Sequence, residues 1–473
     1  MKWLFLVNNA PFLSEFFGKL ADEIIKRGDS CLIVWGCKIA EYKKKKFFPN
    51  GAKHISAIDW CIDNYREEKK EFFRLSWKDF FPLFDRIAAS KFDYKKAIGL
   101  TLQAIQFFEF IFEKEKPNVI ISESPTGLFH QVAYRFCEKN NVLYLGFADS
   151  KINNRIDIYD SGITCSKYER TFREINISRE EKEFAESFVE KFISHQQTPS
   201  SMGFIKIHFG QFGLIKHYIK RIKESGPLLF RYFRERRRFK NFDYESEAIL
   251  KKAISAPLRM ERRQFRIFSQ KNTFSKIRSQ NKEFFLFPLQ FQPEASTDVY
   301  AIYYCDQLNT IKNIAFSLPF PYKLCVKEHL AAIGTRPKEF YEKLKKIPNV
   351  VLVSPYENVE SIVRNSSGVI TLTSTVGLEA ALAGKPVYIL GDVFYSYHPL
   401  CRKVVGFEEL KKKIEENLEG KPKINDLKDI NNRFVASYFR NTILGDIVVA
   451  SRKVDANDYK EMYNDIKRIF FEK

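Results

Sequence analysis

Short apolar runs alternate with amphipathic stretches in the first part of the chain. The run WLFLV is followed by an amphipathic stretch over Ser14–Arg27, by Gly28 as a helix stop, and by the run CLIVWG. The same order returns as KPNVIIS, an amphipathic stretch over Leu128–Asn140, and VLYLGF. Apolar runs of this length are typical of strands buried in a parallel sheet, which amphipathic helices cover. We therefore predict a Rossmann-like domain over residues 1–195.

The alternation resumes more regularly from Glu283 onward. Predicted strands are FFLFPLQF, YKLCVKEH, VVLVS, GVITLT and PVYIL, and the helices between them cover Tyr300–Ser317, Pro337–Lys346, Glu357–Asn365 and Val376 to about Ala383. This alternation of strands and helices predicts a second Rossmann-like domain over residues 283–420. For residues 421–473 we predict polar helices that pack back toward the N-terminal domain.

The composition is that of a folded protein with more than one domain. The chain has 473 residues, of which 45% are hydrophobic and 15% aromatic, so a disordered protein is excluded. Its eight cysteines form no CxxC pair, which favours buried reduced thiols and a cytoplasmic location. The histidines show no metal-binding spacing, and we expect neither a metal nor a cofactor.

The N-terminal run MKWLFLVNNAPF has a superficial likeness to a signal peptide. It lacks a small-residue cleavage site, and Asn8 and Asn9 interrupt it early, so we interpret it as the first strand. No run reaches the roughly 18 apolar residues that a membrane span needs. We expect a soluble or peripheral protein.

Positive charge is concentrated in one segment. The net charge is +20, and residues 201–282 contain 21 Lys or Arg against 6 Asp or Glu. We predict a basic helical insertion over residues 196–282 between the two domains. Basic residues interleaved with Phe and Tyr suit an anionic membrane surface and also suit nucleic acid, while a solvated helix face is the structural alternative.

Polar residues follow the predicted strands of the second domain. Because ligands of open α/β sheets bind beyond the carboxyl ends of the strands, these residues predict a binding site. The alternative is that they are ordinary polar loop residues. The candidates are Gln292, Glu294, Lys327, His329, Ser354, Ser374 and Thr375.

The stretch TLTSTVGLEAALAGKPV predicts a strand, a turn and a short helix. A helix that begins after Ser374 and Thr375 offers backbone N–H groups to a phosphate, and Gly377 leaves room for it. Glu379, one turn further, is placed to accept hydrogen bonds from a ribose diol. The alternative is a capped core helix with Glu379 in solvent.

The segments FQPEAST, DQL, VKEH, GTRPKEFYEKLKKIPNVVLVSP and TSTVGLEAALAGKPV together resemble the bacterial capsular-polysaccharide synthesis family. That family includes transferases that move Kdo from CMP-Kdo to lipid-linked acceptors. The resemblance covers about residues 284–400 and implies a glycosyltransferase-B fold, in which two Rossmann-like domains face a cleft. One departure is His329–Leu330, where the family commonly has His-Pro.

The resemblance also implies roles for individual residues. His329 would donate to the donor phosphate and Lys327 would offset its charge. Structural alternatives are a loop histidine and a surface lysine at a strand end. Since no Asp pair of the DxD type stands in a credible place, fixed cations and helix dipoles would stabilise the leaving nucleoside phosphate.

Glycosyl transfer also needs a carboxylate near the anomeric carbon. Glu123 follows a predicted buried strand of the first domain and would act on the acceptor side of the cleft, as general base or as nucleophile. Glu294 is the competing candidate, and a solvated Glu123 is the structural alternative. Arg155 is a candidate for holding an anionic acceptor.

We therefore predict a metal-independent glycosyltransferase of capsule or lipopolysaccharide assembly. Its donor would be a nucleotide sugar, CMP-Kdo-like in preference to a UDP-sugar, bound as substrate, and its acceptor a lipid-linked saccharide. Since such an acceptor lies at the inner face of the membrane, residues 201–282 are interpreted as a membrane-binding segment and not as a nucleic-acid site. A non-hydrolysing nucleotide-sugar epimerase and a basic nucleic-acid-binding protein are the alternatives.

Overall fold

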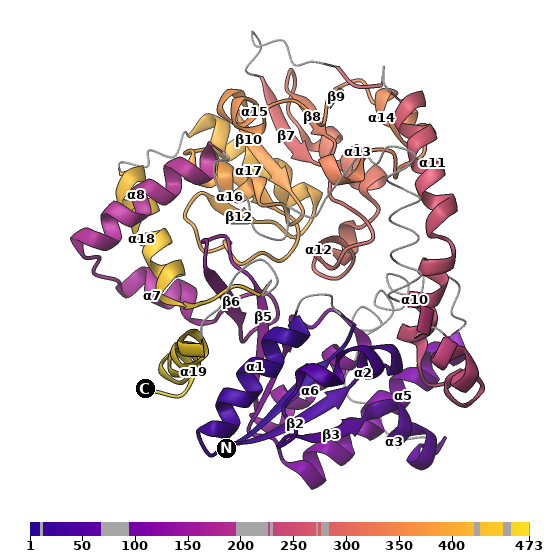
Figure 1. Cartoon of the computed structure of the whole chain (residues 1–473). Helices are drawn as coiled ribbons and strands as arrows, with labels where there is room; N and C mark the ends of the chain where they lie inside the picture. The colour runs from indigo at the N-terminus through magenta and orange to yellow at the C-terminus, as the bar shows by residue number, and fades with distance from the viewer. Residues whose placement is uncertain are drawn as a thin grey trace. The chain divides into compact units, whose positions relative to one another are not determined.

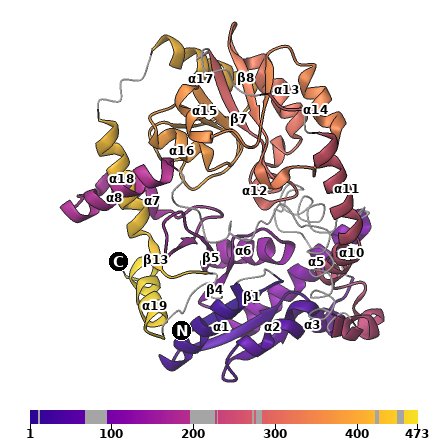
Figure 2. The same ribbon diagram turned by 45° about the horizontal axis from the view of Figure 1, so that its top comes forward.

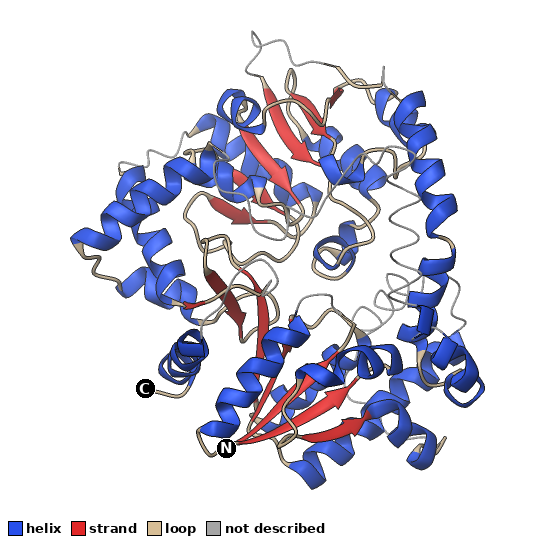
Figure 3. Cartoon of the chain, viewed as in Figure 1, coloured by secondary structure: helices blue, strands red, loops and turns tan. Residues whose placement is uncertain are grey.

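The computed structural model (Figure 1) divides the chain into two compact units. Unit 1 comprises residues 1–166, 198–254 and 440–473, and unit 2 comprises residues 167–197 and 255–439. Each unit has its own sheet, drawn in red in Figure 3. Two α/β units with largely parallel sheets confirm the predicted fold class. The structure describes residues 1–9, 13–67, 94–194, 226–227, 230–270, 273–275, 283–420, 426–447 and 456–472.

The unit boundaries differ from the predicted domain boundaries. The helices α7 (Lys167–Glu174) and α8 (Arg179–Ile193) belong to unit 2, where the Phe184 ring lies 5.0 Å from that of Phe439. The predicted insertion over residues 196–282 is not one body, because α10 (Tyr244–Ile254) belongs to unit 1 and α11 (Ala256–Ser269) to unit 2. Residues 440–473 belong to unit 1, whereas the part of the predicted C-terminal helices before residue 440 belongs to unit 2.

The sheet of unit 1 has the order β13-β6-β5-β4-β1-β2-β3. Its strands from β5 to β3 pair in parallel, and β6 pairs antiparallel with both β5 and β13. The strand bounds are β1 Lys2–Val7, β2 Ser30–Trp35, β3 Lys53–Ser56, β4 Val119–Glu123, β5 Leu143–Asp149, β6 Arg155–Tyr159 and β13 Thr442–Leu444.

Helices cover this sheet, and α1 and α19, far apart in the sequence, lie side by side (Figures 1 and 2). Gly28 takes a φ of +84° just after α1, which is the left-handed conformation of a helix stop. Besides α10, the helices are α1 Leu13–Lys26, α2 Lys38–Lys44, η1 Lys45–Phe47, α3 Ala57–Asn64, α5 Tyr94–Phe110, η2 Ile111–Glu115, α6 Leu128–Asn140 and α19 Ala456–Phe470.

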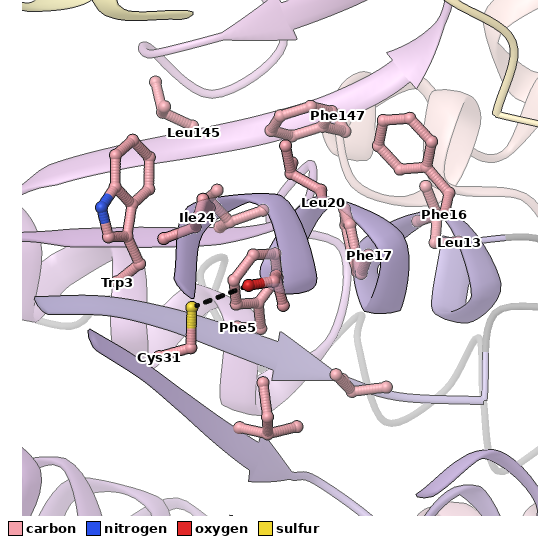
Figure 4. Close-up of a cluster of buried hydrophobic side chains, with 14 of the residues drawn as sticks. Trp3, Phe5, Leu13, Phe16, Phe17, Leu20, Ile24, Cys31, Leu145 and Phe147 are labelled. Carbon is pink, nitrogen blue, oxygen red and sulfur yellow. Dashed lines mark hydrogen bonds between the residues drawn. The ribbon is translucent and has the colours of Figure 1, made fainter. Parts of the chain in front are cut away.

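The strand β1 is buried on both faces, as its unbroken apolar run predicts. Trp3 and Phe5 contribute to one core cluster, while Leu4 and Leu6 contribute to another, since successive side chains of a strand point to opposite faces. Figure 4 shows the first cluster, where the rings of Phe5 and Phe17 have centroids 5.6 Å apart. Burial of these large side chains is the main stabilisation of the unit.

The sheet of unit 2 is parallel throughout, with the order β12-β11-β10-β7-β8-β9. A parallel sheet places the carboxyl ends of all its strands on one edge. The strand bounds are β7 Phe284–Pro288, β8 Lys323–Lys327, β9 Val350–Val353, β10 Gly368–Thr371, β11 Val387–Ile389 and β12 Cys401–Lys403.

The helices of unit 2 agree with the prediction except after β7. The predicted helix over Tyr300–Ser317 begins only at Gln307, because the Asp306 side chain caps it by accepting the Asn309 N–H at 3.2 Å. Besides α7, α8 and α11, the helices are α12 Ala295–Asp298, η4 Ile302–Tyr304, α13 Gln307–Ser317, η5 Leu330–Ala332, α14 Lys338–Lys345, α15 Val359–Asn365, α16 Val376–Leu382, α17 Phe407–Glu419 and α18 Leu427–Arg440.

The eight cysteines form no disulfide bond, and six of them are buried. Within the described ranges, no group of three His, Cys, Asp or Glu side chains is arranged to hold a metal ion. A search of those same ranges finds no helix with the length and apolar character that crossing a membrane requires.

Candidate functional site

The candidate residues of unit 2 follow four neighbouring strands. Ser374 comes after β10, Gln292 after β7, His329 after β8 and Ser354 after β9, and these strands are adjacent in the sheet. The strands are parallel, so all four residues lie at the same edge, where ligands of such sheets bind. The predicted placement at strand ends is therefore confirmed, while the binding roles stay predictions.

His329 is a half-buried cap of the short helix η5. Its Nδ1 accepts the Ala331 N–H at 3.1 Å, so the proton of the neutral ring is assigned to Nε2. Burial lowers the pKa of His329, and the neighbouring Arg336 and Lys327 act in the same direction. The neutral ring therefore carries an N–H donor that a phosphate oxygen could accept.

A buried carboxylate supports this histidine. Oε1 of Glu328 accepts the His329 N–H and pairs with Arg336, each at 2.6 Å, and Oε2 accepts the Tyr341 hydroxyl at 2.6 Å. The Arg336 guanidinium also donates to the Gln290 carbonyl. Glu328 and Arg336 stand inside the motifs VKEH and GTRP, yet no role was predicted for them from the sequence. Three donors on one fully enclosed carboxylate fix the backbone at His329.

Lys327 is buried, contrary to the alternative of a surface lysine. Its Nζ donates to the Pro355 carbonyl at 2.8 Å. Burial lowers the pKa of Lys327, and the carboxylates of Glu328, Glu357 and Glu379 oppose that effect. The residue therefore places a cationic group close to the carboxyl edge of the sheet.

Glu379 is also buried, which corrects the alternative of a solvated carboxylate. It lies in α16 with 8% of its surface exposed, and burial raises its pKa to about 8, against the opposing influence of Lys327. The side chain is therefore largely protonated at neutral pH. A protonated carboxyl group can donate as well as accept a hydrogen bond, and the ribose assignment stays a prediction.

More backbone N–H groups of the turn before α16 are hydrogen-bonded within the turn than predicted. Ser374 Oγ accepts the Val376 N–H at 3.2 Å, and the Ser374 carbonyl accepts the Gly377 N–H at 3.0 Å. Thr375 is the N-cap residue, but its side chain makes no capping bond. A side-chain carbon at Gly377 would lie 2.5 Å from the Tyr395 hydroxyl, so packing requires this glycine. The prediction of free N–H groups is thus wrong for residues 376 and 377.

Gln292, Glu294 and Ser354 make local contacts. Gln292 Nε2 donates to Asp298 at 2.7 Å, and its Oε1 accepts from Gln307 at 2.6 Å. Glu294 precedes α12 and is exposed, and its carboxylate accepts the Ser296 hydroxyl at 3.0 Å. Ser354 Oγ accepts the N–H of residue 356 at 3.3 Å. These contacts hold the loops together, and the predicted donor contacts stay untested.

Glu123 ends β4 of unit 1 and is half-buried. Its Oε1 accepts from the Asn8 side chain at 2.5 Å and from the Thr126 hydroxyl at 3.3 Å, while its carbonyl accepts the Tyr144 hydroxyl at 2.9 Å. Over the ranges that the structure describes, Oε2 has no hydrogen-bond partner. The carboxylate is thus oriented through one oxygen and leaves the other available.

Arg155 is the first residue of β6 and does not lie in a loop. Its guanidinium donates to the Thr442 hydroxyl at 3.0 Å and to the Thr442 carbonyl, which ties β6 to β13. Burial lowers the pKa of this arginine. The structure gives Arg155 a role in the sheet, and the proposed acceptor contact remains a prediction.

Two further side chains, Asn8 and Asp149, belong to the surroundings of Glu123 and were not predicted as site residues from the sequence. Asn8 was treated only as an interruption of the apolar run, although it directs the carboxylate. Asp149 ends β5, the neighbour of β4, and its buried Oδ2 has no hydrogen-bond partner in the described parts of the chain. An acidic residue at the end of each of two adjacent strands was the signal that could have identified this edge.

A comparison with known families finds a match over the part of the chain that contains the candidate residues of unit 2. Residues 233–417 match the model of a family described as capsule polysaccharide biosynthesis protein. This range encloses the span of about residues 284–400 that carries the motif resemblance. No curated protein matches the chain.

The solved structures that match this chain have low sequence identity to it and low TM-scores. KpsC beta Kdo 2,7 transferase from Thermosulfurimonas dismutans has 15% identity, 79% coverage of this chain, 97% of its own and a TM-score of 0.33. The beta Kdo 2,4 transferase of the same organism has 12% identity, coverages of 68% and 80%, and a TM-score of 0.37. UDP-GlcNAc 2-epimerase from Neisseria meningitidis has 13% identity, coverages of 99% and 100%, and a TM-score of 0.27. At such TM-scores these likenesses carry no argument about the site.

The family match falls on the part of the chain that contains Lys327 and His329 at the end of β8 and Glu379 in α16. Over residues 233–417 the chain matches the capsule polysaccharide biosynthesis family, which confirms the predicted resemblance for that region.

Proposed function

We propose that the enzyme moves a sugar from a nucleotide-activated donor to a lipid-linked or growing bacterial surface polysaccharide. The observation that carries the proposal is the carboxyl edge of the unit 2 sheet, where a buried Lys327 and a neutral His329 stand at the end of β8 and a protonatable Glu379 lies in α16, the helix after β10, all inside the family's matched region. The preference for a CMP-Kdo-like donor over a UDP-sugar rests on the motif resemblance.

In this proposal the donor's phosphate is held without a metal. Nε2–H of His329 donates to a phosphate oxygen, and the Lys327 ammonium stabilises the charge that develops as the nucleoside phosphate leaves. Glu379 contacts the ribose, where its carboxyl group can both donate and accept. The nucleotide sugar is a substrate, and the reaction draws on no cofactor.

The carboxylate of transfer is assigned to Glu123. Its Oε1 is held by Asn8 and Thr126, so Oε2 is the oxygen that takes the proton of the acceptor hydroxyl, or that attacks the anomeric carbon in a retaining route. Glu294 is the competing candidate. It is exposed and its carboxylate has the Ser296 hydroxyl as a partner, which favours Glu123.

The acceptor is proposed to be reached at the inner face of the membrane through the basic helices. Two arginines of the tract Arg236–Arg238 have acidic neighbours, since Arg236 pairs with Glu247 at 3.3 Å and Arg238 lies 3.9 Å from Asp63. These two arginines therefore already have carboxylates beside them. The exposed face of α11 is the better candidate for membrane contact. Residues 196–225, 228–229, 271–272 and 276–282 of the segment lie outside the described residues.

A donor screen tests the proposed function. The protein is incubated with CMP-Kdo and with UDP-sugars, with and without membrane lipid extract, and products are identified by mass spectrometry. Transfer, or release of the nucleotide with free sugar, supports the proposal, whereas an isomerised donor supports an epimerase. His329→Ala should lower the rate at least tenfold, because it removes the N–H donor to the phosphate. Wild-type activity in this variant would exclude the donor assignment.

A further inference from the structure

Behind Glu123 lies a buried lysine that the proposed function does not use. Lys44, the last residue of α2, is 4% exposed, and its Nζ donates to the Asn8 carbonyl at 3.1 Å. The Asn8 side chain in turn donates to Oε1 of Glu123 at 2.5 Å. One residue, Asn8, therefore links the ammonium to the carboxylate, and its position depends on both contacts.

Burial of the Lys44 ammonium lowers the stability of the folded protein, which indicates that this lysine has a role in function. A buried ammonium loses its hydration, and a side chain such as Met would fill a similar volume without that loss. Asn8 follows β1 and Glu123 ends β4, two adjacent parallel strands, so the lysine stands at the carboxyl edge of the unit 1 sheet. That edge is where ligands of such sheets bind.

The groups around Lys44 place its titration close to neutral pH. Burial lowers the pKa of Lys44 to about 8, with Lys43 acting in the same direction and with Cys37, Glu123 and Glu245 opposing it. Glu245 comes from α10 and is itself buried. Lys44 therefore carries its charge below about pH 8 and loses it above.

We propose that Lys44 and Asn8 are positioning residues for Glu123: the ammonium fixes the Asn8 backbone, the Asn8 amide holds Oε1, and Oε2 is thereby presented to the substrate. The inference rests on the proposed function of Glu123 as the carboxylate of transfer. A lysine of the same unit thus controls whether that carboxylate is correctly oriented, and loss of the lysine's charge weakens this control, because a neutral amine is a weaker hydrogen-bond donor to the Asn8 carbonyl than an ammonium.

A thermal double-mutant cycle tests the link without any need for a substrate. The variants are Lys44→Met, Glu123→Gln and their combination, and the matched control pairs Glu123→Gln with Lys46→Met, an exposed lysine of η1. We expect the melting-temperature shifts of the first pair to depart from additivity by about 2 °C or more, and those of the control pair to add within about 1 °C. Additive shifts in the first pair would overturn the proposal.

The pH dependence of donor consumption, measured with CMP-Kdo or a UDP-sugar, is the second test. The wild-type rate should fall above about pH 8, Lys44→Arg should move this fall upward by at least one pH unit, and Lys44→Met should lose at least tenfold in rate and show no such fall. A fall that is unchanged in both variants, or absent in the wild type, would overturn the proposal. Glu123→Gln at the wild-type rate would instead reject the role of Glu123, and the thermal cycle would still decide the link.

Discussion

The Arg336 guanidinium lies 2.6 Å from the fully enclosed carboxylate of Glu328. The two residues belong to motifs that are eight positions apart in the sequence, and together they fix the backbone that carries His329. Buried ion pairs of this kind contribute little net stability when intact, but breaking one leaves an uncompensated charge in the interior. The presence of this ion pair is therefore better explained by its effect on the position of His329 than by a net contribution to the stability of the protein.

Replacing Arg336 by Ala should destabilise the protein by about 3–5 kcal/mol, because Glu328 would remain buried without its cationic partner. Adding Glu328→Gln to this variant should recover part of the loss. Chemical denaturation measures both effects. The control is Arg364→Ala, which breaks an exposed pair with Glu360 and should cost no more than about 0.5 kcal/mol. Equal losses in the two arginine variants would contradict the assignment.

Glu379 should make stability depend on pH. Burial raises its pKa from 4.5 to about 8, so between these values the folded protein holds a proton that the unfolded chain has lost. The contribution of Glu379 is thus fully present below about pH 4.5 and is lost as the pH rises through about 8. Glu379→Gln, which resembles the protonated form, should melt higher than the wild type at pH 9 and at nearly the same temperature at pH 5.

The matched control for this prediction is Glu339→Gln, an exposed glutamate of α14. Its melting temperature should differ from that of the wild type by the same small amount at both pH values, because this side chain is exposed to solvent in the folded protein. The prediction would be contradicted if the melting temperature rose from pH 5 to pH 9 in the wild type but not in Glu379→Gln.

Much of the fold could be predicted from the sequence because its strands are short unbroken apolar runs. In a parallel sheet covered by helices, both faces of a strand are buried, so the runs stand out against the amphipathic helices. The run WLFLV became β1, and GVITLT became β10 followed by the turn at Ser374. Strand-end residues could be named for the same reason, since the position after each apolar run is visible in the sequence.

The assignment of segments to the two units could not be predicted, because it depends on contacts between distant residues. The side chain of Asp243 accepts the Lys38 N–H from 205 positions away, and this bond attaches α10 to unit 1. The burial of Glu379 was also not visible, because a glutamate one turn inside a helix is usually solvated. Such facts depend on which elements pack together, and the local pattern does not contain them.

Asp243 stabilises two helix N-termini at once. Its Oδ2 accepts the Lys38 N–H of α2 at 2.9 Å, and its Oδ1 accepts the Ser246 N–H of α10 at 3.0 Å, with the carboxylate fully buried. Asp243→Ala should therefore cost about 2–4 kcal/mol, since two buried donors would lose their acceptor. Asp306→Ala, which removes the exposed cap of α13 only, should cost about 1 kcal/mol in the same denaturation experiment. Similar costs for the two variants would show that Asp243 does not join the helices.

The exposed face of α11 combines aromatic rings with positive charge. Phe265 and Phe268 are 72% and 69% exposed, and the exposed Arg262 lies one turn before Phe265. Rings that enter the interface and arginines that approach anionic head groups are the usual means of peripheral membrane binding. The same helix is held to unit 2 through Arg263, whose guanidinium donates to the carbonyls of Ile333 and Ala331.

The combined change Phe265→Ser and Phe268→Ser should reduce cosedimentation with vesicles of equal phosphatidylcholine and phosphatidylglycerol by at least about fivefold, because each ring contributes apolar area to the interface. Arg262→Glu should reduce it further and should weaken its dependence on salt, since about 1 kcal/mol of attraction per basic residue is screened at high ionic strength. The control is Phe316→Ser with Phe320→Ser, two rings of unit 2 that are 64% and 96% exposed outside α11. If the control lowered binding as much as the α11 variant, the rings would act as general exposed apolar surface, and α11 would lose its assignment as the membrane contact.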